Sequence, residues 1–407
     1  MIMERPPHLL ILTPTDGVGG TQSIIVSLTR QLMVHGWIVR TILSNGPNSG
    51  AWWCREQGVD VETHPAVIDA YDYLMQYHGL KSVGRFARDM LMMRHLVRQS
   101  NPDVVNLHYG GSFVSLKDVI AVRLAGAYPC IASVHHSMPW DDHNEEHRRM
   151  RRMTRLAAKL CHAVIVPSYA TRNTLIEAGV SKRKIFVVPN GLRTPTTTIT
   201  QQEARARLGL PTEAFIVASL SRLVKEKGIA DLIMAIDSMP DPNRCLLLVI
   251  GGDGPDRAAF EQLAMQSKQR VKFLGYIPDT ADLYAAADVF ALPSHMEGFG
   301  LVYVEAAFRG LPSIGTNIGG IPEVIIHERT GLLVPLGDRT GLATAIHRLQ
   351  EDGALRRRLG DAARARALTE FSEVRMAEQY VSILIAASIA KQGGLQVLRS
   401  IGANVKM

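Results

Sequence analysis

The chain has 407 residues, of which 46% are hydrophobic and 20% are charged. This length predicts two or three domains, and the composition excludes a disordered, collagen-like or coiled-coil protein. The formal net charge is +7, and all of it lies in the first half. Residues 1–195 hold 22 lysines and arginines against 15 acidic residues, whereas residues 196–407 hold 23 of each. A basic first half favours an anionic partner, either a lipid surface or a nucleic acid.

The amino terminus does not have the pattern of a secretory signal peptide, because Glu4, Arg5 and two prolines precede only a short apolar run. The longest late apolar run, residues 381–390, is about half as long as a membrane span. The cysteines lie far apart without a Cys-x-x-Cys pair, which argues against a disulfide framework or a zinc site and favours a reducing cytosol. We therefore expect a cytoplasmic protein that at most attaches peripherally to the inner face of the membrane.

Short apolar runs alternate with amphipathic stretches through the first half, a pattern that predicts β-α-β units and a parallel sheet buried on both faces. The two clearest amphipathic stretches are residues 21–35 and 80–99. The predicted strands are His8–Leu12, Ile38–Leu43, Val104–Leu107, Cys130–Val134, Ala163–Val166 and Ile185–Val188.

A polar, threonine-rich stretch at residues 192–202 is the best candidate for a linker, and the same alternation begins again after it. The later predicted strands are Phe215–Leu220, Leu246–Ile250, Val271–Leu274, Val289–Leu292, Pro312–Gly315 and Leu332–Val334. We therefore predict an α/β protein in which two Rossmann-like domains, 1–195 and 196–370, face each other across a cleft. Residues 371–390 are expected to form a helix that packs back toward the first domain, and residues 391–407 a loose tail.

Two glutamates flank a glycine-containing loop after the strand that ends at Leu292. The spacing places Glu297 in the loop and Glu305 in the following helix. The amides of this loop would lie at a helix N-terminus, which suits a phosphate group; they belong to Gly298, Phe299, Gly300 and Leu301. Glu305 could then accept hydrogen bonds from hydroxyls attached to that phosphate, and Glu297 would reach the group on its far side. The alternative makes both glutamates ordinary surface charges.

Two cations, Arg222 and Lys227, bracket the loop that follows the strand ending at Leu220. At the carboxyl end of a parallel strand they would offset the charge of a diphosphate. The alternative is a solvated basic loop before a helix.

Three weaker patterns lie in the first half. Gly19 and Gly20 follow the first strand and permit a close approach of the backbone to an anion, although Gly17 does not complete a dinucleotide-binding motif. His135 follows a strand and points toward the expected cleft, or is simply a loop histidine. Residues 145–159 predict a basic helix with methionine and leucine along one side, which would contact anionic lipid or nucleic acid, or only solvent.

Together these residues resemble the retaining glycosyltransferases of family four, which have the GT-B fold. Glu297 and Glu305 resemble the family's paired-glutamate motif, and residues 221–228 resemble its phosphate-binding segment. The family's continuation is also similar, at Arg309–Pro312, Gly319–Glu323 and Thr330–Val334. The loops at 250–255 and 273–276, the pair Gly19–Gly20 and the segment Ser133–His135 resemble further family motifs.

The resemblance implies a hexosyltransferase that moves a sugar from a UDP- or GDP-sugar to a glycan or lipid-linked acceptor in cell-surface polysaccharide or glycolipid biosynthesis. Arg222 and Lys227 would neutralise the leaving diphosphate, and Glu305 would hold the ribose. Gly254 and Tyr276 would border the nucleoside. Glu297 would contact the sugar near its reacting face and His135 its outer hydroxyls, as catalytic residues. The second domain would bind the donor and the first the acceptor.

No strict Asp-x-Asp occurs, so a carboxylate clamp for a metal-bound diphosphate is not indicated, and we expect neither a metal nor another cofactor. The alternatives are another two-domain nucleotide-sugar enzyme, such as a phosphorylase or an epimerase, and a basic nucleic-acid-binding protein. A phosphorylase of the glycogen type would need a lysine that binds pyridoxal phosphate, and no convincing site exists. The nucleic-acid alternative lacks aromatic residues among its arginines and leaves the glutamate loop unexplained. We therefore do not expect nucleic acid as a partner.

Overall fold

The computed structural model describes residues 5–14, 19–46, 50–67, 80–111, 113–136, 139–141, 143–196, 199–240 and 245–390. The chain divides into two compact units, one made of Met1–Leu192 and Glu373–Met407 and the other of Arg193–Ser372. The division therefore falls three residues before the expected boundary at 195. Gly17 and the expected tail at 391–407 lie outside the described residues.

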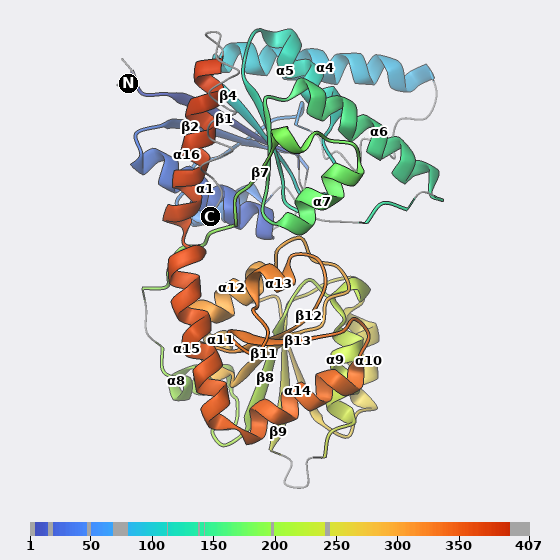
Figure 1. Ribbon diagram of the computed structural model, residues 1–407, viewed down its shortest axis with the longest axis vertical. Coiled ribbons are helices and arrows are strands. Elements are labelled where there is room, and N and C mark those ends of the chain that lie inside the picture. The colour runs from blue at the N-terminus through green and yellow to red at the C-terminus, as the bar shows by residue number, and fades with distance from the viewer. Residues whose placement is uncertain are drawn as a thin grey trace. The chain divides into compact units, whose positions relative to one another are not determined.

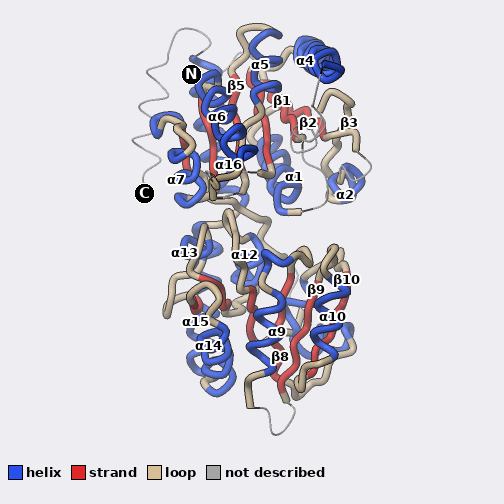
Figure 2. The backbone as a smooth tube through the Cα atoms, turned by 90° about the vertical axis from the view of Figure 1, so that its right-hand side faces the viewer, coloured by secondary structure: helices blue, strands red, loops and turns tan. Residues whose placement is uncertain are grey.

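The first unit contains a parallel sheet of seven strands in the order β3-β2-β1-β4-β5-β6-β7. Figures 1 and 2 show helices on the flanks of this sheet. The strands are β1 His8–Thr13, β2 Ile38–Leu43, β3 Glu62–Thr63, β4 Val104–Tyr109, β5 Cys130–Val134, β6 Ala163–Val166 and β7 Ile185–Val187. The helices are α1 Gly20–Val34, α2 Ala51–Glu56, α4 Leu80–Ser100, α5 Leu116–Ala125, α6 Glu145–Leu160, α7 Tyr169–Glu177 and α16 Glu373–Ala390, with a short 3₁₀ turn at Lys182–Lys184.

The last helix, α16, packs against α1 and reaches β4, which places the end of the described chain on the first unit (Figure 1). Its start is fixed by Glu373, whose backbone amide donates to the carbonyl of Leu192 and whose carboxylate accepts from the side chain of Gln31. Tyr380, a residue of this helix, is almost fully buried. The helix thus covers one face of the sheet near β4, which matters for the polar groups on that face.

The second unit repeats the same strand order, β10-β9-β8-β11-β12-β13, again entirely parallel. The strands are β8 Phe215–Leu220, β9 Leu246–Gly251, β10 Arg270–Gly275, β11 Val289–Leu292, β12 Ser313–Thr316 and β13 Gly331–Val334. The helices are α8 Gln201–Leu208, α9 Ile229–Asp237, α10 Arg257–Met265, α11 Ala281–Ala286, α12 Leu301–Phe308, α13 Ile321–Val324, α14 Arg339–Glu351 and α15 Gly353–Glu370, with a 3₁₀ turn at Lys225–Lys227.

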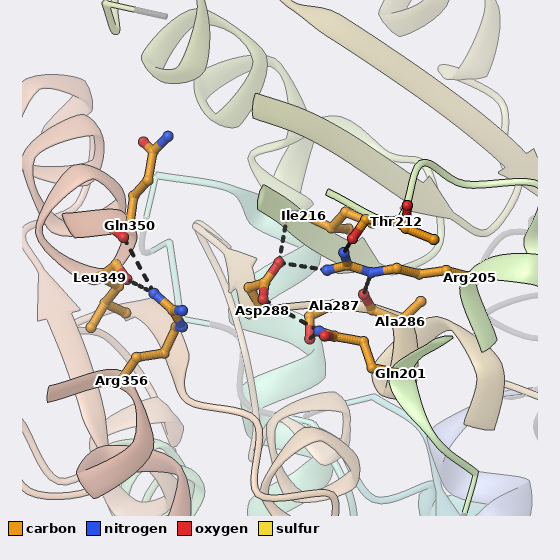
Figure 3. Close-up of polar contacts among 10 residues, drawn as sticks. All are labelled: Gln201, Arg205, Thr212, Ile216, Ala286, Ala287, Asp288, Leu349, Gln350 and Arg356. Atoms are coloured by element: carbon orange, nitrogen blue, oxygen red, sulfur yellow. Dashed lines mark hydrogen bonds and ion pairs between the residues drawn. The ribbon is translucent and has the colours of Figure 1, made fainter. Parts of the chain in front are cut away.

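A buried ion pair attaches α8 to the amino ends of the strands in the second unit. Arg205 donates through Nη2 to Oδ2 of Asp288 at 2.8 Å, and the same oxygen accepts from the amide of Ile216 (Figure 3). Arg205 also donates to the backbone carbonyls of Thr212 and Ala286. Because every charged group here is satisfied, the guanidinium tolerates burial. The amino ends of the strands are thus held by structural contacts, and the long loops lie at the carboxyl ends.

The expected strands agree with the structure within one residue at each end, except that β4 continues two residues further, to Tyr109, and the two-residue β3 was not expected. Their near-continuous hydrophobicity has the expected cause, since Leu9, Leu10, Ile11 and Leu12 of β1 are all completely buried. The basic stretch 145–159 forms a helix as expected, α6. Met150 of this helix is buried, whereas Leu156 and Leu160 are 44% and 41% exposed. Within the described residues, no helix has both the length and the apolarity required to span a bilayer.

Candidate functional site

Two loops of the second unit meet where the strand order reverses, between β8 and β11. One loop follows β8 and ends at Gly228, and the other follows β11, beginning at Pro293. Gly228 has a φ of 69°, and a Cβ at this position would lie 2.0 Å from the carbonyl oxygen of Pro293. Only glycine permits this approach. Open parallel sheets bind ligands at such a reversal, beyond the carboxyl ends of the strands.

An ion pair joins these two loops. Nζ of Lys227 lies 2.7 Å from Oε2 of Glu297, and the two side chains are 21% and 14% exposed. From the sequence we expected both residues in one site but on different sides of a ligand, so their contact is new. Arg222 is exposed and its side chain has no hydrogen bond or ion pair within the described residues. The site therefore holds one cation that is already partnered and one that is available.

The loop that carries Glu297 is held by two glycines after β12. The amide of Gly320 donates to the carbonyl oxygen of Glu297 at 3.1 Å. A Cβ on Gly319, where φ is 53°, would lie 2.2 Å from that same oxygen, and one on Gly320 would lie 2.3 Å from the carbonyl oxygen of Gly298. These contacts explain why glycine is needed at both positions. They fix the height of the Glu297 backbone above the sheet.

Helix α12 begins directly after this loop. Gly300 adopts a φ of 95° as its N-cap, and Leu301 is the first helical residue. The first amides of a helix have no partner within it and form the positive end of its dipole, so this end suits an anion. Phe299 is buried, and its ring packs edge-on against Phe371 with centroids 5.6 Å apart. Phe299 thus anchors the loop through its side chain, while the neighbouring glycines keep the backbone accessible.

Glu305 lies on α12, facing the start of α11. Oε2 of Glu305 accepts from the hydroxyl of Thr280 at 3.3 Å. Burial raises the pKa of the Glu305 carboxyl, and the hydroxyls of Tyr284 and Thr280 partly oppose that rise. A carboxylate in such an enclosed position gains most when further hydroxyls donate to it.

The loops after β9 and β10 complete this edge of the second unit. A Cβ on Gly254 would lie 2.4 Å from the carbonyl oxygen of Leu223, and the amide of Leu223 donates to the carbonyl of Asp253 at 2.9 Å. Gly254 therefore lets the β9 loop pack directly on the β8 loop. Tyr276 follows β10 and is 50% exposed, leaving its ring available for contact with a planar group.

Three residues that the sequence did not indicate form hydrogen bonds that orient the β11 loop. His295 belongs to the loop, and Asp231 and Arg339 come from α9 and α14. Nε2 of His295 lies 2.6 Å from Oδ2 of Asp231, and Nε of Arg339 lies 2.7 Å from Oδ1 of the same carboxylate. Burial tends to raise the pKa of Asp231, but the hydrogen bonds from Arg339 and His295 outweigh it and lower the pKa overall. His295 stands two residues before Glu297 in the same motif, and this proximity is the only sequence signal that pointed to it.

His135 of the first unit lies just after β5 and belongs to a different kind of site. Its Nε2 lies 2.9 Å from Nδ1 of His108, whose own Nε2 lies 2.8 Å from Nδ2 of Asn106. Burial lowers the pKa of His135 to about 4 and that of His108 well below its ordinary value. The two imidazoles are therefore neutral at ordinary pH. Sequence reasoning found His135 and missed His108 and Asn106.

Gly19 and Gly20 lie at the start of α1, with Gly19 as the N-cap in an extended conformation. The amide of Ser23 donates to the carbonyl of Gly19 at 3.1 Å, so the first turn of the helix is formed here. The residues immediately before Gly19 are outside the described part of the chain. In the described part, no three histidine, cysteine or acidic side chains gather as a metal site would require.

Comparisons with known proteins agree on one group of enzymes. Residues 200–366 match the family described as glycosyl transferases group 1, and residues 18–194 match the family described as glycosyltransferase family 4. A D-inositol 3-phosphate glycosyltransferase of Corynebacterium aurimucosum is 31% identical over 322 residues, which cover 74% of this chain and 75% of the relative.

The lipopolysaccharide core biosynthesis glycosyltransferase LpsD of Rhizobium meliloti is 38% identical over 205 residues, half of this chain and 57% of the relative. The chain thus spans little more than half the length of that protein. Among solved structures, Anabaena Alr3699/HepE in complex with UDP-glucose superimposes with a TM-score of 0.74 at 23% identity, over 93% of this chain and 99% of that one. This likeness shows the same two-domain α/β fold.

Proposed function

The chain belongs to the family 4 glycosyltransferases, and on that premise we propose that it transfers a sugar from a nucleotide-sugar donor to a glycan or lipid-linked acceptor, with retention at the anomeric carbon. The observation that carries the proposal is the joining of Lys227 and Glu297 beside the N-terminus of α12, at the strand-order reversal of the second unit. We place the diphosphate of the donor here.

Two kinds of group act on the leaving diphosphate. Arg222 and Lys227 offset its negative charge, and the amides of Gly298–Leu301 donate to its oxygens. Interactions of this kind accelerate a reaction when they strengthen as charge develops in the transition state. Glu305 accepts from the ribose hydroxyls, and the ring of Tyr276 borders the base. In this proposal Lys227 exchanges part of its contact with Glu297 for the phosphate when the donor arrives.

The transfer is a substitution at the anomeric carbon. The bond from that carbon to the diphosphate oxygen breaks and its electron pair goes to the diphosphate, while the acceptor oxygen forms the new bond on the same face. The acceptor proton passes to the departing diphosphate oxygen. Glu297, released from Lys227, would face the positive charge that develops on the sugar ring, and His135 would donate to a sugar hydroxyl. No metal is needed in this scheme, because side-chain cations and backbone amides provide the neutralisation.

The test is the release of nucleoside diphosphate from a panel of UDP- and GDP-sugars, with and without glycan or lipid-linked acceptors, after exhaustive chelation. We expect one donor to give diphosphate and a glycosylated product whose new linkage keeps the donor's anomeric configuration. Inversion at that carbon would contradict retention. Loss of activity on chelation, restored by magnesium or manganese, would contradict metal independence. Interconversion of nucleotide sugars without diphosphate release would identify an epimerase, and a requirement for inorganic phosphate would identify a phosphorylase.

We further propose that α6 attaches the first unit to an anionic membrane surface, as a lipid-linked acceptor would require. A groove of about 270 Å³ runs along this helix beside Glu177, Ala178 and Gly179. Its remaining lining consists of Arg148, Arg151, Arg152 and Arg155. The exposed Leu156 and Leu160 lie on the same helix. Arginines beside exposed leucines on one helix are typical of a segment that lies in the lipid interface.

Vesicle co-sedimentation tests this attachment. Each basic residue near an anionic surface contributes about 1 kcal/mol, so replacing Arg152 and Arg155 by glutamine should weaken binding to phosphatidylserine vesicles about 10- to 30-fold. The matched control replaces Arg357 and Arg364, two exposed arginines of α15, and should retain binding. Equal partition of the wild-type protein to neutral and anionic vesicles would refute the proposal.

A further inference from the structure

A chain of buried polar side chains leads to His135 in the first unit. The hydroxyl of Tyr380 donates to Oγ of Ser133 at 3.3 Å, and that hydroxyl donates to Oδ1 of Asn106 at 3.0 Å. Nδ2 of Asn106 lies 2.8 Å from Nε2 of His108, and Nδ1 of His108 lies 2.9 Å from Nε2 of His135. Ser133, Asn106 and His108 are completely buried, and Tyr380 nearly so.

The register of the sheet brings these groups together. β4 and β5 are parallel neighbours in which His108 pairs with Ser133. Asn106 and His108 are two residues apart on β4, and Ser133 and His135 are two residues apart at the end of β5, so each pair lies on the same side of its strand. The alternate residues of these strands, such as Leu107 and Val134, belong to the apolar core on the other side. On the polar side, α16 supplies Tyr380.

The amide of Asn106 gives the chain a direction. Its Oδ1 can only accept and its Nδ2 can only donate. Because Oδ1 accepts from Ser133, Nδ2 donates to Nε2 of His108, which must then be unprotonated. A neutral imidazole carries its proton on the other nitrogen, so Nδ1 of His108 donates to Nε2 of His135. By the same rule, Nδ1 of His135 carries the proton.

We propose that Asn106 and His108 are positioning residues that hold His135 as the tautomer protonated at Nδ1, so that it presents an N–H donor to its ligand. That the ligand is a sugar hydroxyl rests on the proposed function; the tautomer itself does not. The tautomer decides whether this hydrogen bond can form. With the proton on Nδ1, His135 donates to a sugar oxygen, whereas in the opposite tautomer Nδ1 has only a lone pair and cannot donate.

The far nitrogen of His135 supports this assignment. Nδ1 of His135 is buried and has no hydrogen-bond partner within the described residues. A buried donor without a partner is unfavourable, and this cost is removed when a ligand oxygen accepts from it. Since burial also lowers the pKa of this imidazole to about 4, His135 stays neutral and donates without becoming a second positive charge. The hydrogen-bonded side chains from Tyr380 to His135 therefore fix the direction of the hydrogen bond that His135 makes, and they add no charge.

Nitrogen NMR of histidine labelled with ¹⁵N, recorded without any ligand, tests the inference directly. In the wild-type protein, His135 should carry its proton on Nδ1 and have a bare Nε2. A proton on Nε2 of His135 would overturn the proposal, and this measurement needs no variant that must fold.

The decisive variant is Asn106→Asp. A carboxylate accepts from both neighbours, so a neutral His108 must then donate through Nε2 and accept through Nδ1, which moves the proton of His135 to Nε2. The same spectrum shows whether His108 is neutral or carries protons on both nitrogens. Tyr380→Phe is the control, because it removes the first hydroxyl while the link from Ser133 to Asn106 remains, and it should leave the proton on Nδ1. An unchanged tautomer beside a neutral His108 in a folded Asn106→Asp protein would overturn the role of Asn106.

Steady-state kinetics with the matched donor separate this inference from the proposed function. The inverted tautomer should lower kcat/KM for transfer about 10- to 100-fold, as expected for the loss of one hydrogen bond with a buried group left unpaired. An inverted tautomer with wild-type kinetics would remove His135 from the sugar site, and so contradict that part of the proposed function, while the directional chain itself would stand.

Discussion

The two units share one strand order but place opposite kinds of chemistry at their strand ends. In the second unit, Lys227 and Glu297 are charged and lie in loops beyond the sheet. In the first unit, Asn106 and His108 are neutral and lie within the sheet itself. The difference shows that one α/β architecture offers two different positions for polar function.

The physical reason is the cost of desolvation. A loop at the sheet edge keeps some contact with water, which lowers the cost of holding the Lys227–Glu297 ion pair there. Inside the sheet an ion would pay several kcal/mol, and only neutral groups that satisfy one another are tolerated. The loop cluster, which consists of Lys227 and Glu297, can therefore respond to charge that develops in a reaction. The buried chain can only fix the direction of a hydrogen bond.

The largest effect should follow from removing charge in the loop cluster. Replacing Glu297 by glutamine removes the partner of Lys227 and the carboxylate that we propose to lie nearest the reacting sugar. We expect kcat to fall about 10²- to 10³-fold, as for other groups that act mainly in the transition state, with little change in the affinity for donor. Glu226→Gln, an exposed carboxylate beside Lys227 in sequence, is the matched control. Equal kinetics of the two variants would remove Glu297 from the site.

A second large effect should follow from moving the same loop without altering its charge. Gly319→Ala would push a methyl group to within 2.2 Å of the carbonyl oxygen of Glu297, so the loop must shift and kcat should fall about tenfold or more. Gly337→Ala is the control, because Gly337 also has a positive φ, 76°, but has open space around its Cβ. Only backbone strain of about 1–2 kcal/mol acts there, and it should appear in the melting temperature rather than in kcat.

The buried chain should appear instead in the response of the first unit to acid. Burial lowers the pKa of His108 and of His135, so the unfolded chain binds protons that the folded unit does not. As the pH falls below about 6.5, each histidine should reduce stability by up to about 1.4 kcal/mol per pH unit, and for His135 this loss ends near pH 4.

His108→Gln should therefore be less sensitive to acid in this range, whatever its stability at neutral pH. Hydrogen exchange of the β4 and β5 amides at about pH 7 and about pH 5 measures this slope in the first unit alone. The exposed His347 of the second unit provides the control variant. If His108→Gln retains the wild-type dependence of stability on pH, the assignment of His108 as a buried neutral group is contradicted.

The smallest effect should come from Glu305, the enclosed carboxylate on α12. Because burial raises its pKa, the folded protein holds this proton more tightly than the unfolded chain, and stability is lost as the pH rises through the ordinary value of 4.5 toward the raised one. Glu305→Gln should therefore raise the melting temperature by a few degrees near pH 7 and by nothing near pH 4. Its donor affinity should fall at the same time. A variant that melts lower at neutral pH would contradict the assigned pKa shift.

Much of the loop site was predictable because its residues are close in sequence and follow recognisable strands. Arg222 and Lys227 follow β8, and Glu297 follows β11, so the order of the strands alone placed them at one edge. What could not be predicted was the direct contact of Lys227 with Glu297, which depends on Gly228 packing on Pro293. Asp231 and Arg339 were also missed, since nothing local distinguishes them from surface charges.

The sequence by itself determined the strands other than the short β3, their buried faces and the loops of the second unit in which we propose the catalytic groups, because hydrophobic period and glycine position act over a few residues. Only the tertiary structure decided that Tyr380 of α16 joins Ser133, Asn106 and His108 in one hydrogen-bonded chain. These residues are separated by up to 274 positions in the sequence. Their polarity is permitted only because each satisfies the next after the sheet and α16 have excluded water. The direction of such a hydrogen bond is thus set by residues that only the folded structure brings together, and no single segment of the sequence encodes it.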